Sequence, residues 1–122
     1  MVEPATVPYC RPRVVTVFKD LALAPGSTAT SETLENDILN IALRIQSTGT
    51  ADVQIQEPRD REGWSTTGSM EVLEGETVWH YTLKQDKFRL RVENGSGDRV
   101  VVTIQANLPC RAEAPEEMVR RW

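Results

Sequence analysis

The sequence predicts an all-β domain, either an antiparallel β-sandwich or a jelly roll of about seven or eight short strands. Apolar and polar residues alternate with period two over several segments, which is the pattern of strands with one buried face. Turn residues separate these segments at intervals of about 8–12 residues, as in sandwiches. A length of 122 residues with 39% hydrophobic residues suits one thin two-layer domain. We expect the sandwich domain at residues 13–110, between an extended N-terminal arm at 1–12 and a C-terminal tail at 111–122.

The expected N-terminal arm carries a proline at every fourth position, namely Pro4, Pro8 and Pro12. Proline favours extended backbone and excludes a helix, so the arm is predicted to be extended. The β-branched run at 14–18 predicts the first strand. Residues 24–33 are rich in Pro, Gly, Ser and Thr and predict a loop.

Residues 38–47 form the clearest predicted strand, because its apolar residues stand at every second position: Leu39, Ile41, Leu43 and Ile45. A helix over 32–39 is a competing prediction, since residues 33–36 could cap it, but the alternation that follows favours the strand. Residues 47–50 predict a turn. Apolar residues then alternate again from Ala51 to Ile55, which predicts the second arm of a hairpin.

The second half of the chain begins with a predicted charged loop at 57–63, which is followed by predicted strands at 70–73, 77–84, 88–93 and 100–108. Turn signals stand at 74–75 and 94–98. The last strand has an apolar face made by Val100, Val102, Ile104, Ala106 and Leu108. Pro115 and the two glutamates after it predict a short helix in the tail, because proline suits the first helical position and acids suit the first turn.

The charge and the apolar runs exclude two classes of partner. A net charge of −4 lacks the basic footprint that nucleic-acid binding needs, so no nucleic acid is expected. No apolar run approaches the length of a membrane span, so no membrane partner is expected. Eleven of the cations are arginines and three are lysines, which fits either protein interfaces or a coding bias. The first residues show no signal-peptide pattern, so synthesis in the cytoplasm is expected.

The chain has two cysteines, Cys10 and Cys110, which bracket the predicted sandwich. Bonded to each other, they would close a loop of about 100 residues and contribute roughly 4–5 kcal/mol in the chain-entropy model. Bonded to neighbouring subunits, they would lock an assembly. The third alternative is a pair of reduced thiols. Zinc needs four ligands, and the two cysteines have only His80 to join them, so no metal and no cofactor are predicted.

The sequence offers little for catalysis. His80 is the single histidine, and no neighbour in the sequence would orient it as a general acid or base, so we expect a structural or surface histidine and no enzyme. The loop acids Glu57, Asp60 and Glu62 could bind Ca²⁺, but interleaved arginines compete for them and the spacing is not that of an EF-hand.

Three further motifs have a structural explanation that competes with a functional one. Trp79 and Tyr81 share a strand face and could stack on a sugar, although such pairs more often belong to the core. Trp64 is expected to plug the core at the start of a strand. Asn94-Gly95-Ser96 is formally a glycosylation sequon, but it coincides with a strong turn signal that explains the same residues.

The two ends of the chain carry residue types that dominate the energy of protein interfaces. We predict partner contacts by Tyr9, Arg11 and Arg13 of the N-terminal region and by Arg120, Arg121 and Trp122 of the tail. Extended arms can lace subunits together by adding a strand to an exposed sheet edge. The competing interpretation is that the chain ends are frayed.

The stretch from Leu39 to Ala106 resembles small β-sandwich proteins of bacteriophage virions and of some bacterial surfaces. The motifs that carry the likeness are Gly49–Ile55, a charged loop ending at Trp64, a turn at Gly75, and two strands marked by Arg89–Val92 and Val102–Ile104. Many such proteins have Asp-Gly before the tryptophan, where this chain has Glu62-Gly63. The resemblance implies a decoration, cement or accessory role and carries over no functional residue.

These observations favour a non-enzymatic structural protein, a virion decoration or accessory protein that binds and stabilises a capsid or similar protein lattice. We expect a homo-oligomer that is made in the host cytoplasm and ends in the virion, where an oxidising environment could join the cysteines. The alternative is a cell-surface or secreted binding module, for example for carbohydrate, and an exposed Trp79–Tyr81 face would favour it.

Overall fold

The computed structural model describes residues 13–59 and 63–109, and these residues form nine β-strands and no helix. The strands are β1 (Arg13–Leu23), β2 (Thr28–Thr30), β3 (Leu34–Glu35), β4 (Asn40–Ser47), β5 (Ala51–Pro58), β6 (Trp64–Val72), β7 (Gly75–Thr82), β8 (Lys87–Glu93) and β9 (Val100–Leu108). The all-β prediction is confirmed. The predictions for residues 1–12 and 110–122, including the tail helix, lie outside the described residues.

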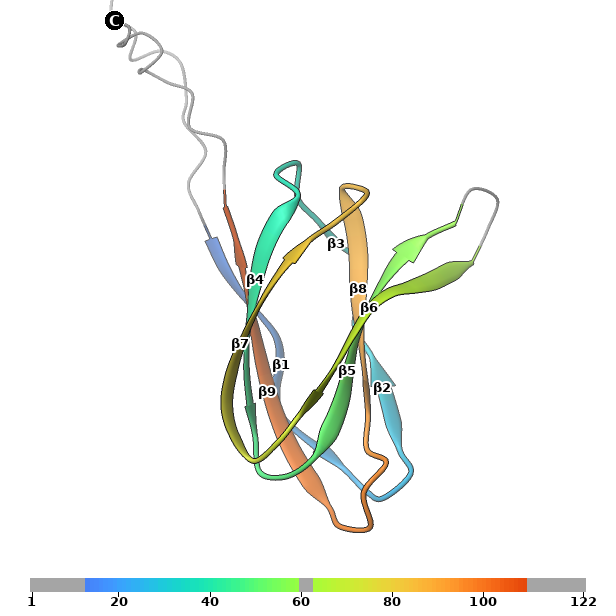
Figure 1. Ribbon diagram of the computed structural model, residues 1–122, viewed down its shortest axis with the longest axis vertical. Coiled ribbons are helices and arrows are strands. Elements are labelled where there is room, and N and C mark those ends of the chain that lie inside the picture. Colours follow the sequence, from blue (N-terminus) through green and yellow to red (C-terminus); the bar gives the residue numbers. More distant parts are fainter. Residues whose placement is uncertain (1–12, 60–62, 110–122) are drawn as a thin grey trace, which may run out of the picture.

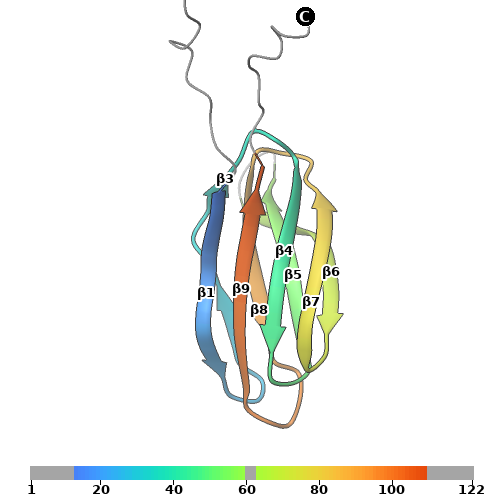
Figure 2. The ribbon, with the colours of Figure 1, turned by 90° about the vertical axis from the view of Figure 1, so that its left-hand side faces the viewer.

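The strands form two antiparallel sheets that face each other (Figures 1 and 2). The first sheet has the order β1-β9-β4-β7, and the second has the order β2-β8-β5-β6, with β3 also pairing to β8. The pairing is nested along the chain, because β1 pairs with β9, β2 with β8, β4 with β7 and β5 with β6. Nested pairing across two sheets is the arrangement of a jelly roll, one of the two architectures that the sequence predicts.

The core lies between the sheets and consists largely of the alternating residues that the sequence pattern identified. Leu43, Ile45, Val53, Ile55 and their counterparts on β8 and β9 are completely buried. All five residues of the predicted inner face of β9 belong to this core. Because a strand turns every second side chain to the same face, period two in the sequence was sufficient to find them.

The hairpin predicted from 38–47 and 51–55 is wrong. β4 pairs with β7 and β9 in the first sheet, whereas β5 pairs with β6 and β8 in the second. The turn between them therefore crosses from one sheet to the other. It is held by β9: the Thr48 amide donates to the Val101 carbonyl (3.1 Å), and the Val101 amide donates to Thr48 Oγ1 (2.9 Å).

Two other predicted loops are partly strand. The segment predicted as a loop at 24–33 contains β2, which pairs with β8, and the competing helix over 32–39 is replaced in part by β3. The predicted charged loop at 57–63 begins too early, because β5 continues to Pro58 and Glu57 is only 1% exposed. β2 and β3 form because β8 is available to pair with them, and Glu57 is buried because backbone amides donate to it. In both places these tertiary contacts override the loop that the polar local sequence predicts.

β6 and β7 are the edge strands of their two sheets on the open side of the sandwich, and a short turn joins them at one end (Figure 1). Tyr81 of β7 bridges this side, and its hydroxyl donates to the Thr67 carbonyl of β6 (2.7 Å). The ring passes so close to Gly68 that a Cβ atom there would lie 2.6 Å from a ring carbon. Glycine at 68 is therefore required for this close approach of side chain and backbone.

Candidate functional site

The start of β1 and the end of β9 lie side by side at one end of the sandwich. Arg13, at the start of β1, pairs directly with Leu108, at the end of β9 (Figure 1). Both positions are fastened to the segment around β3. The Arg13 guanidinium donates to the Glu35 carbonyl (2.7 Å), and Asn36 Nδ2 donates to the Pro109 carbonyl (3.0 Å). The paired residues Arg13 and Leu108 are called the arm roots.

Of the predicted partner contacts, Arg13 is an exposed residue of an arm root. The others lie outside the described residues, as do both cysteines: Tyr9, Cys10, Arg11, Cys110, Arg120, Arg121 and Trp122. Among the predicted contacts, the structure therefore describes Arg13 alone.

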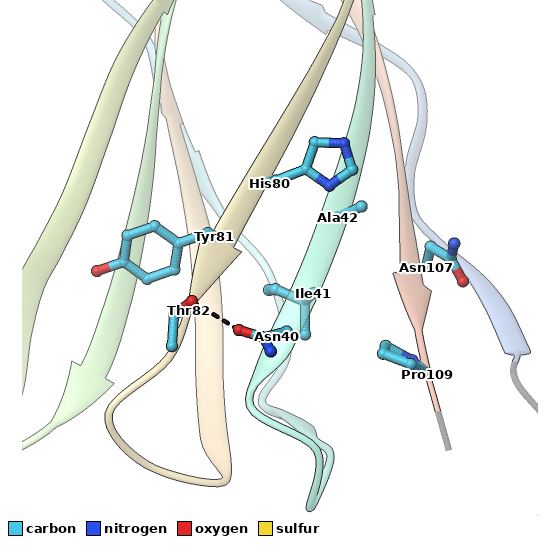
Figure 3. A pocket seen from close by; sticks show the side chains of 8 residues that line it. All are labelled: Asn40, Ile41, Ala42, His80, Tyr81, Thr82, Asn107 and Pro109. Atoms are coloured by element: carbon cyan, nitrogen blue, oxygen red, sulfur yellow. Dashed lines mark hydrogen bonds between the residues drawn. The ribbon is translucent and has the colours of Figure 1, made fainter. Parts of the chain in front are cut away.

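The outer face of the first sheet is hollowed at its two ends. At the end near the arm roots, His80 of β7 and Asn107 of β9 stand on either side of Ala42 of β4, and Pro109 adjoins them (Figure 3). This hollow has a volume of about 380 Å³. Thr82 donates a hydrogen bond to Asn40 Oδ1 (2.6 Å) at its rim. His80 is exposed, and no described residue hydrogen-bonds its ring.

A second hollow of about 410 Å³ lies at the opposite end of the same face and is lined by residues that include Gln46, Thr48 and Thr103. Between the hollows, Arg44 of β4 forms an exposed ion pair with Glu76 of β7, with 2.6 Å between Nε and Oε2. The outward side chains of β9 carry no charge. The face is thus polar and close to neutral, which suits docking to a polar protein surface better than electrostatic capture of a charged ligand.

The Arg44–Glu76 pair gives a pH-dependent prediction. The hydrogen bond from Arg44 holds the pKa of Glu76 below its usual value of 4.5, and the same contact raises the pKa of Arg44. A carboxyl whose pKa is lower in the folded state stabilises the fold above its unfolded pKa, and this contribution disappears as the pH falls through the folded pKa. Replacing Arg44 by glutamine is therefore expected to raise the Glu76 pKa toward 4.5 in a carboxyl NMR titration.

The effect of Arg44→Gln on unfolding should be small, because the pair is exposed to solvent. It should be seen near neutral pH and vanish in acid. Arg99→Gln is the matched control, since Arg99 is also exposed and forms no ion pair with the described residues. An unchanged Glu76 pKa in Arg44→Gln, or an equal change in both variants, would contradict the prediction.

The outer face of the second sheet carries a ladder of arginine and glutamine. Arg89 Nε donates to Gln56 Oε1 (2.8 Å), and Arg91 Nη1 donates to Gln54 Oε1 (3.2 Å). The Arg89 guanidinium also lies 4.4 Å from the centre of the Trp64 ring, which is a cation–π contact. Trp64 is half-buried on this outer face, so its expected role as a core plug is wrong.

The carboxylate of Glu57 is the centre of a hydrogen-bond network near the arm-root end of the sandwich. One carboxylate oxygen accepts from the backbone amides of Lys84 and Gln85, both at 2.8 Å, and the other accepts from Thr67 Oγ1 at 2.7 Å. A carboxylate with both oxygens engaged by structural donors closes the loop between β7 and β8. The calcium hypothesis therefore loses Glu57 as a ligand, while Asp60 and Glu62 lie outside the described residues. Within 13–59 and 63–109, no group of three His, Cys, Asp or Glu could hold a metal ion.

Two of the competing interpretations are settled by packing. Trp79 and Tyr81 are half-buried against the core and meet edge to face, with ring centres 5.6 Å apart, so the core interpretation of this pair is confirmed. Asn94 is completely buried, and its side chain hydrogen-bonds to Leu23, Ser96 and Asp98. The sequon asparagine therefore acts in the turn, as the turn signal indicated.

Sequence reasoning missed Glu57, Arg89 and Asn36 as residues that organise these surfaces. For Glu57 a signal existed, because it continues the buried positions of Val53 and Ile55 at the same parity. The stacking of Arg89 on Trp64 joins β8 to β6 across β5, and Asn36 joins the β3 segment to the end of β9. Such pairings between distant segments leave no local pattern in the chain.

Comparison with known proteins gives structural likenesses only. No protein-family model matches the sequence, and no curated protein matches it. The PBSX exported protein XepA superposes with a TM-score of 0.68 and 15% identity, over 84% of this chain and 39% of XepA. PirA superposes with a TM-score of 0.52 and 15% identity, over 85% of this chain and 96% of PirA. A designed double-stranded β-helix has a TM-score of 0.48 at 15% identity, over 77% of this chain and 97% of the design.

At 15% identity the likenesses to XepA and PirA show the fold alone, an all-β sandwich. The chain spans about two fifths of the length of XepA. In the part of the chain that the structure describes, there is no helix with the length and hydrophobicity needed to cross a membrane.

Proposed function

We propose that this protein is a non-enzymatic accessory or structural protein, which binds a capsid or similar protein lattice through its jelly roll and its terminal arms. The observation that supports this most is the position of the arm roots. Arg13 and Leu108 are directly paired, so the first described residue and the end of the last strand lie together at one end of the sandwich. Two extended segments leaving one rigid body can reach neighbouring molecules on the same side.

The sandwich supplies the rigid body in this proposal. Its core is completely buried across both sheets, and the network around Glu57 and Tyr81 ties the sheets together at their open side. The outer face of the first sheet is polar and nearly neutral, which fits contact with a protein surface. No nucleic acid, membrane or cofactor is part of the proposed role.

The comparisons support the phage-related part of the proposal. XepA is described as an exported protein of the phage PBSX, and its fold is the nearest to this one among the three likenesses above. We extend to this chain a phage-related origin and a location in the virion or outside the cell. An exposed Trp79–Tyr81 face would have favoured carbohydrate binding instead, and that face is packed against the core.

The proposal includes a disulfide between Cys10 and Cys110. Cys10 stands three positions before Arg13, and Cys110 stands two positions after Leu108. Extended backbone spans about 3.3–3.6 Å per residue, so the short segments between the paired arm roots and the two cysteines are long enough for Cys10 and Cys110 to meet. A disulfide needs Cα atoms about 4.4–6.8 Å apart, which this tether length permits. Such a bond would fix the bases of both arms.

Deletion of either arm tests the proposal. Variants lacking residues 1–12 or 115–122 are expected to assemble less, which native mass spectrometry shows as a lower mean assembly mass. Their β-type circular dichroism should be unchanged, because the core lies between the sheets. Cys10→Ser in the full chain is the matched control, since it removes the thiol and keeps the arm. An unchanged assembly mass would refute the arm mechanism, and loss of the β signal would show that the arms belong to the core.

A further inference from the structure

The two sheets have four edges, and three of them are protected against pairing with another chain. The β1 edge has two register shifts, carries Lys19, and has Asp20 with a φ of 50°. The β6 edge has a register shift, and its Thr67 carbonyl already accepts a hydrogen bond from the Tyr81 hydroxyl. The edge formed by β2 and β3 offers strands of only three and two residues. Bulges, lysines and short strands are the usual means by which edge strands avoid association.

The β7 edge has none of these protections. Its eight residues pair with β4 without a register shift, and they include no Lys, Arg or Pro. No described residue pairs with its other side. Val78, near the middle of the strand, is 52% exposed on the outer face of the sheet. A long, regular and uncapped edge of this kind is a template for one more strand.

We propose that β7 pairs antiparallel with β7 of a second copy of this chain, which joins the two first sheets into one continuous sheet across a two-fold axis. A two-fold contact must be self-complementary: if one residue of the first copy faces a second residue of the other copy, then the second residue of the first copy faces the first residue of the other. Side chains on the outer face must also meet outer-face side chains, because a shift by one residue reverses the faces. Only a few registers satisfy both conditions.

The register centred on Val78 is the one with chemical complementarity. It places Val78 opposite the Val78 of the second copy, so that the exposed apolar side chains cover each other. It also places Glu76 opposite the second copy's His80, twice by symmetry. Centring on Trp79 would put Val78 opposite His80, and centring on His80 would put two histidines together. Apolar pairs and pairs of polar groups that can hydrogen-bond stabilise a sheet when they lie directly opposite each other on two strands.

The groups that face Glu76 and His80 agree with this arrangement. Arg44, on the neighbouring strand β4, already pairs with Glu76. Ala42, directly opposite His80 on β4, is small and uncharged. The second copy's His80 would therefore approach a carboxylate that is held in place and that can accept a hydrogen bond from the imidazole N–H.

This inference deepens the proposed function, since it names the contact that makes the protein a homo-oligomer, and it can fail independently of the arms. The test is sedimentation velocity of the full chain over a concentration series. Val78→Lys places two like charges on the two-fold axis and is expected to weaken dimerisation about tenfold or more. Val14→Lys is the matched control, because Val14 is also exposed (64%) but lies on the protected β1 edge. Both variants should keep the wild-type melting temperature within a few degrees, which circular dichroism checks.

A crosslinking experiment tests the register directly. Val78→Cys is made in a full chain that also carries Cys10→Ser and Cys110→Ser, and the protein is treated with a short bismaleimide. Directly opposite residues have Cβ atoms about 4.5–5.5 Å apart, so efficient crosslinking into a dimer is expected. Val14→Cys in the same background should stay largely monomeric.

Each outcome decides one of the proposals. A wild-type monomer at every concentration would overturn β7 pairing, as would equal effects of the lysine variants or efficient crosslinking at position 14. If Val78→Lys changes nothing while arm deletion lowers the assembly mass, the β7 contact is wrong and the arm mechanism stands. If Val78→Lys splits the dimer while arm deletion changes nothing, the β7 contact stands and the arm mechanism fails.

Discussion

Replacement of Glu57 by alanine is expected to lower the free energy of unfolding by about 2–4 kcal/mol. The backbone amides of Lys84 and Gln85 and the hydroxyl of Thr67 would lose the carboxylate that accepts their hydrogen bonds. Glu57 is 1% exposed, so water does not easily replace it. The hydrogen bonds are partly buried, and leaving three donors without their acceptor costs part of the desolvation of each group, which makes the loss larger than that of an ordinary surface substitution.

Two variants serve as controls for Glu57→Ala. Glu57→Gln keeps one carbonyl oxygen as an acceptor for the two amides and should recover part of the loss. Glu71→Ala removes an exposed glutamate from β6 and should stay within about 0.5 kcal/mol of the wild type. Urea titration followed by tryptophan fluorescence measures all three. If Glu57→Ala unfolded at the same urea concentration as Glu71→Ala, the network around Glu57 would have no part in stability.

Oxidised protein is expected to be about 4–5 kcal/mol more stable than reduced protein, because a Cys10–Cys110 bond would close a loop of about 100 residues in the unfolded chain. The paired arm roots make the intramolecular bond the expected one. The measurement is urea unfolding with and without reductant, together with alkylation of the oxidised protein under denaturing conditions. Neither thiol should be alkylated, and the protein should run as a monomer on a denaturing gel without reductant.

Cys10→Ser is the control for this second prediction, and its unfolding should no longer depend on reductant. A disulfide-linked dimer on the non-reducing gel would support the bond between subunits instead. Alkylation of both thiols in air-oxidised protein would support the reduced pair. A loss of stability in Cys10→Ser that is equal in excess reductant would show that the side chain matters for packing alone.

Arms and edge would have different tasks if both proposals hold. The β7 contact would join two copies by backbone hydrogen bonds along a sheet, whereas the arm roots lie at the end where β1 begins and β9 ends. β7 forms one edge of the first sheet, whereas the arm roots lie near the opposite edge, at the end where β1 begins, as Figure 2 shows. A dimer could thus present two pairs of arms to a lattice without using its dimer contact for binding.

The sequence by itself determined the class of fold and most of the core. Alternation along β4, β5, β8 and β9 identified Leu43, Val53, Leu90 and Ile104 as inward-facing, and all are buried. The turn signal at 94–98 was correct because Asn94 satisfies its hydrogen bonds within a few residues of itself and at the end of β1. These features depend on geometry that repeats within a strand or a turn, so a local pattern records them.

Only the tertiary structure decided which sheet each strand joins and what the polar residues near strand ends do. A turn of a few residues serves equally for a hairpin or for a crossing between sheets, so the separation of β4 from β5 could not be predicted from 47–50. The expectation that Trp64 lies in the core was wrong, because its contact with Arg89, 25 positions away in the sequence, leaves no local sign. The pairing of Arg13 with Leu108, and the bare edge of β7, exist only once all strands have taken their places. Contacts between distant segments depend on the closure of the whole fold, and the residues that make them carry no periodic signal in the chain.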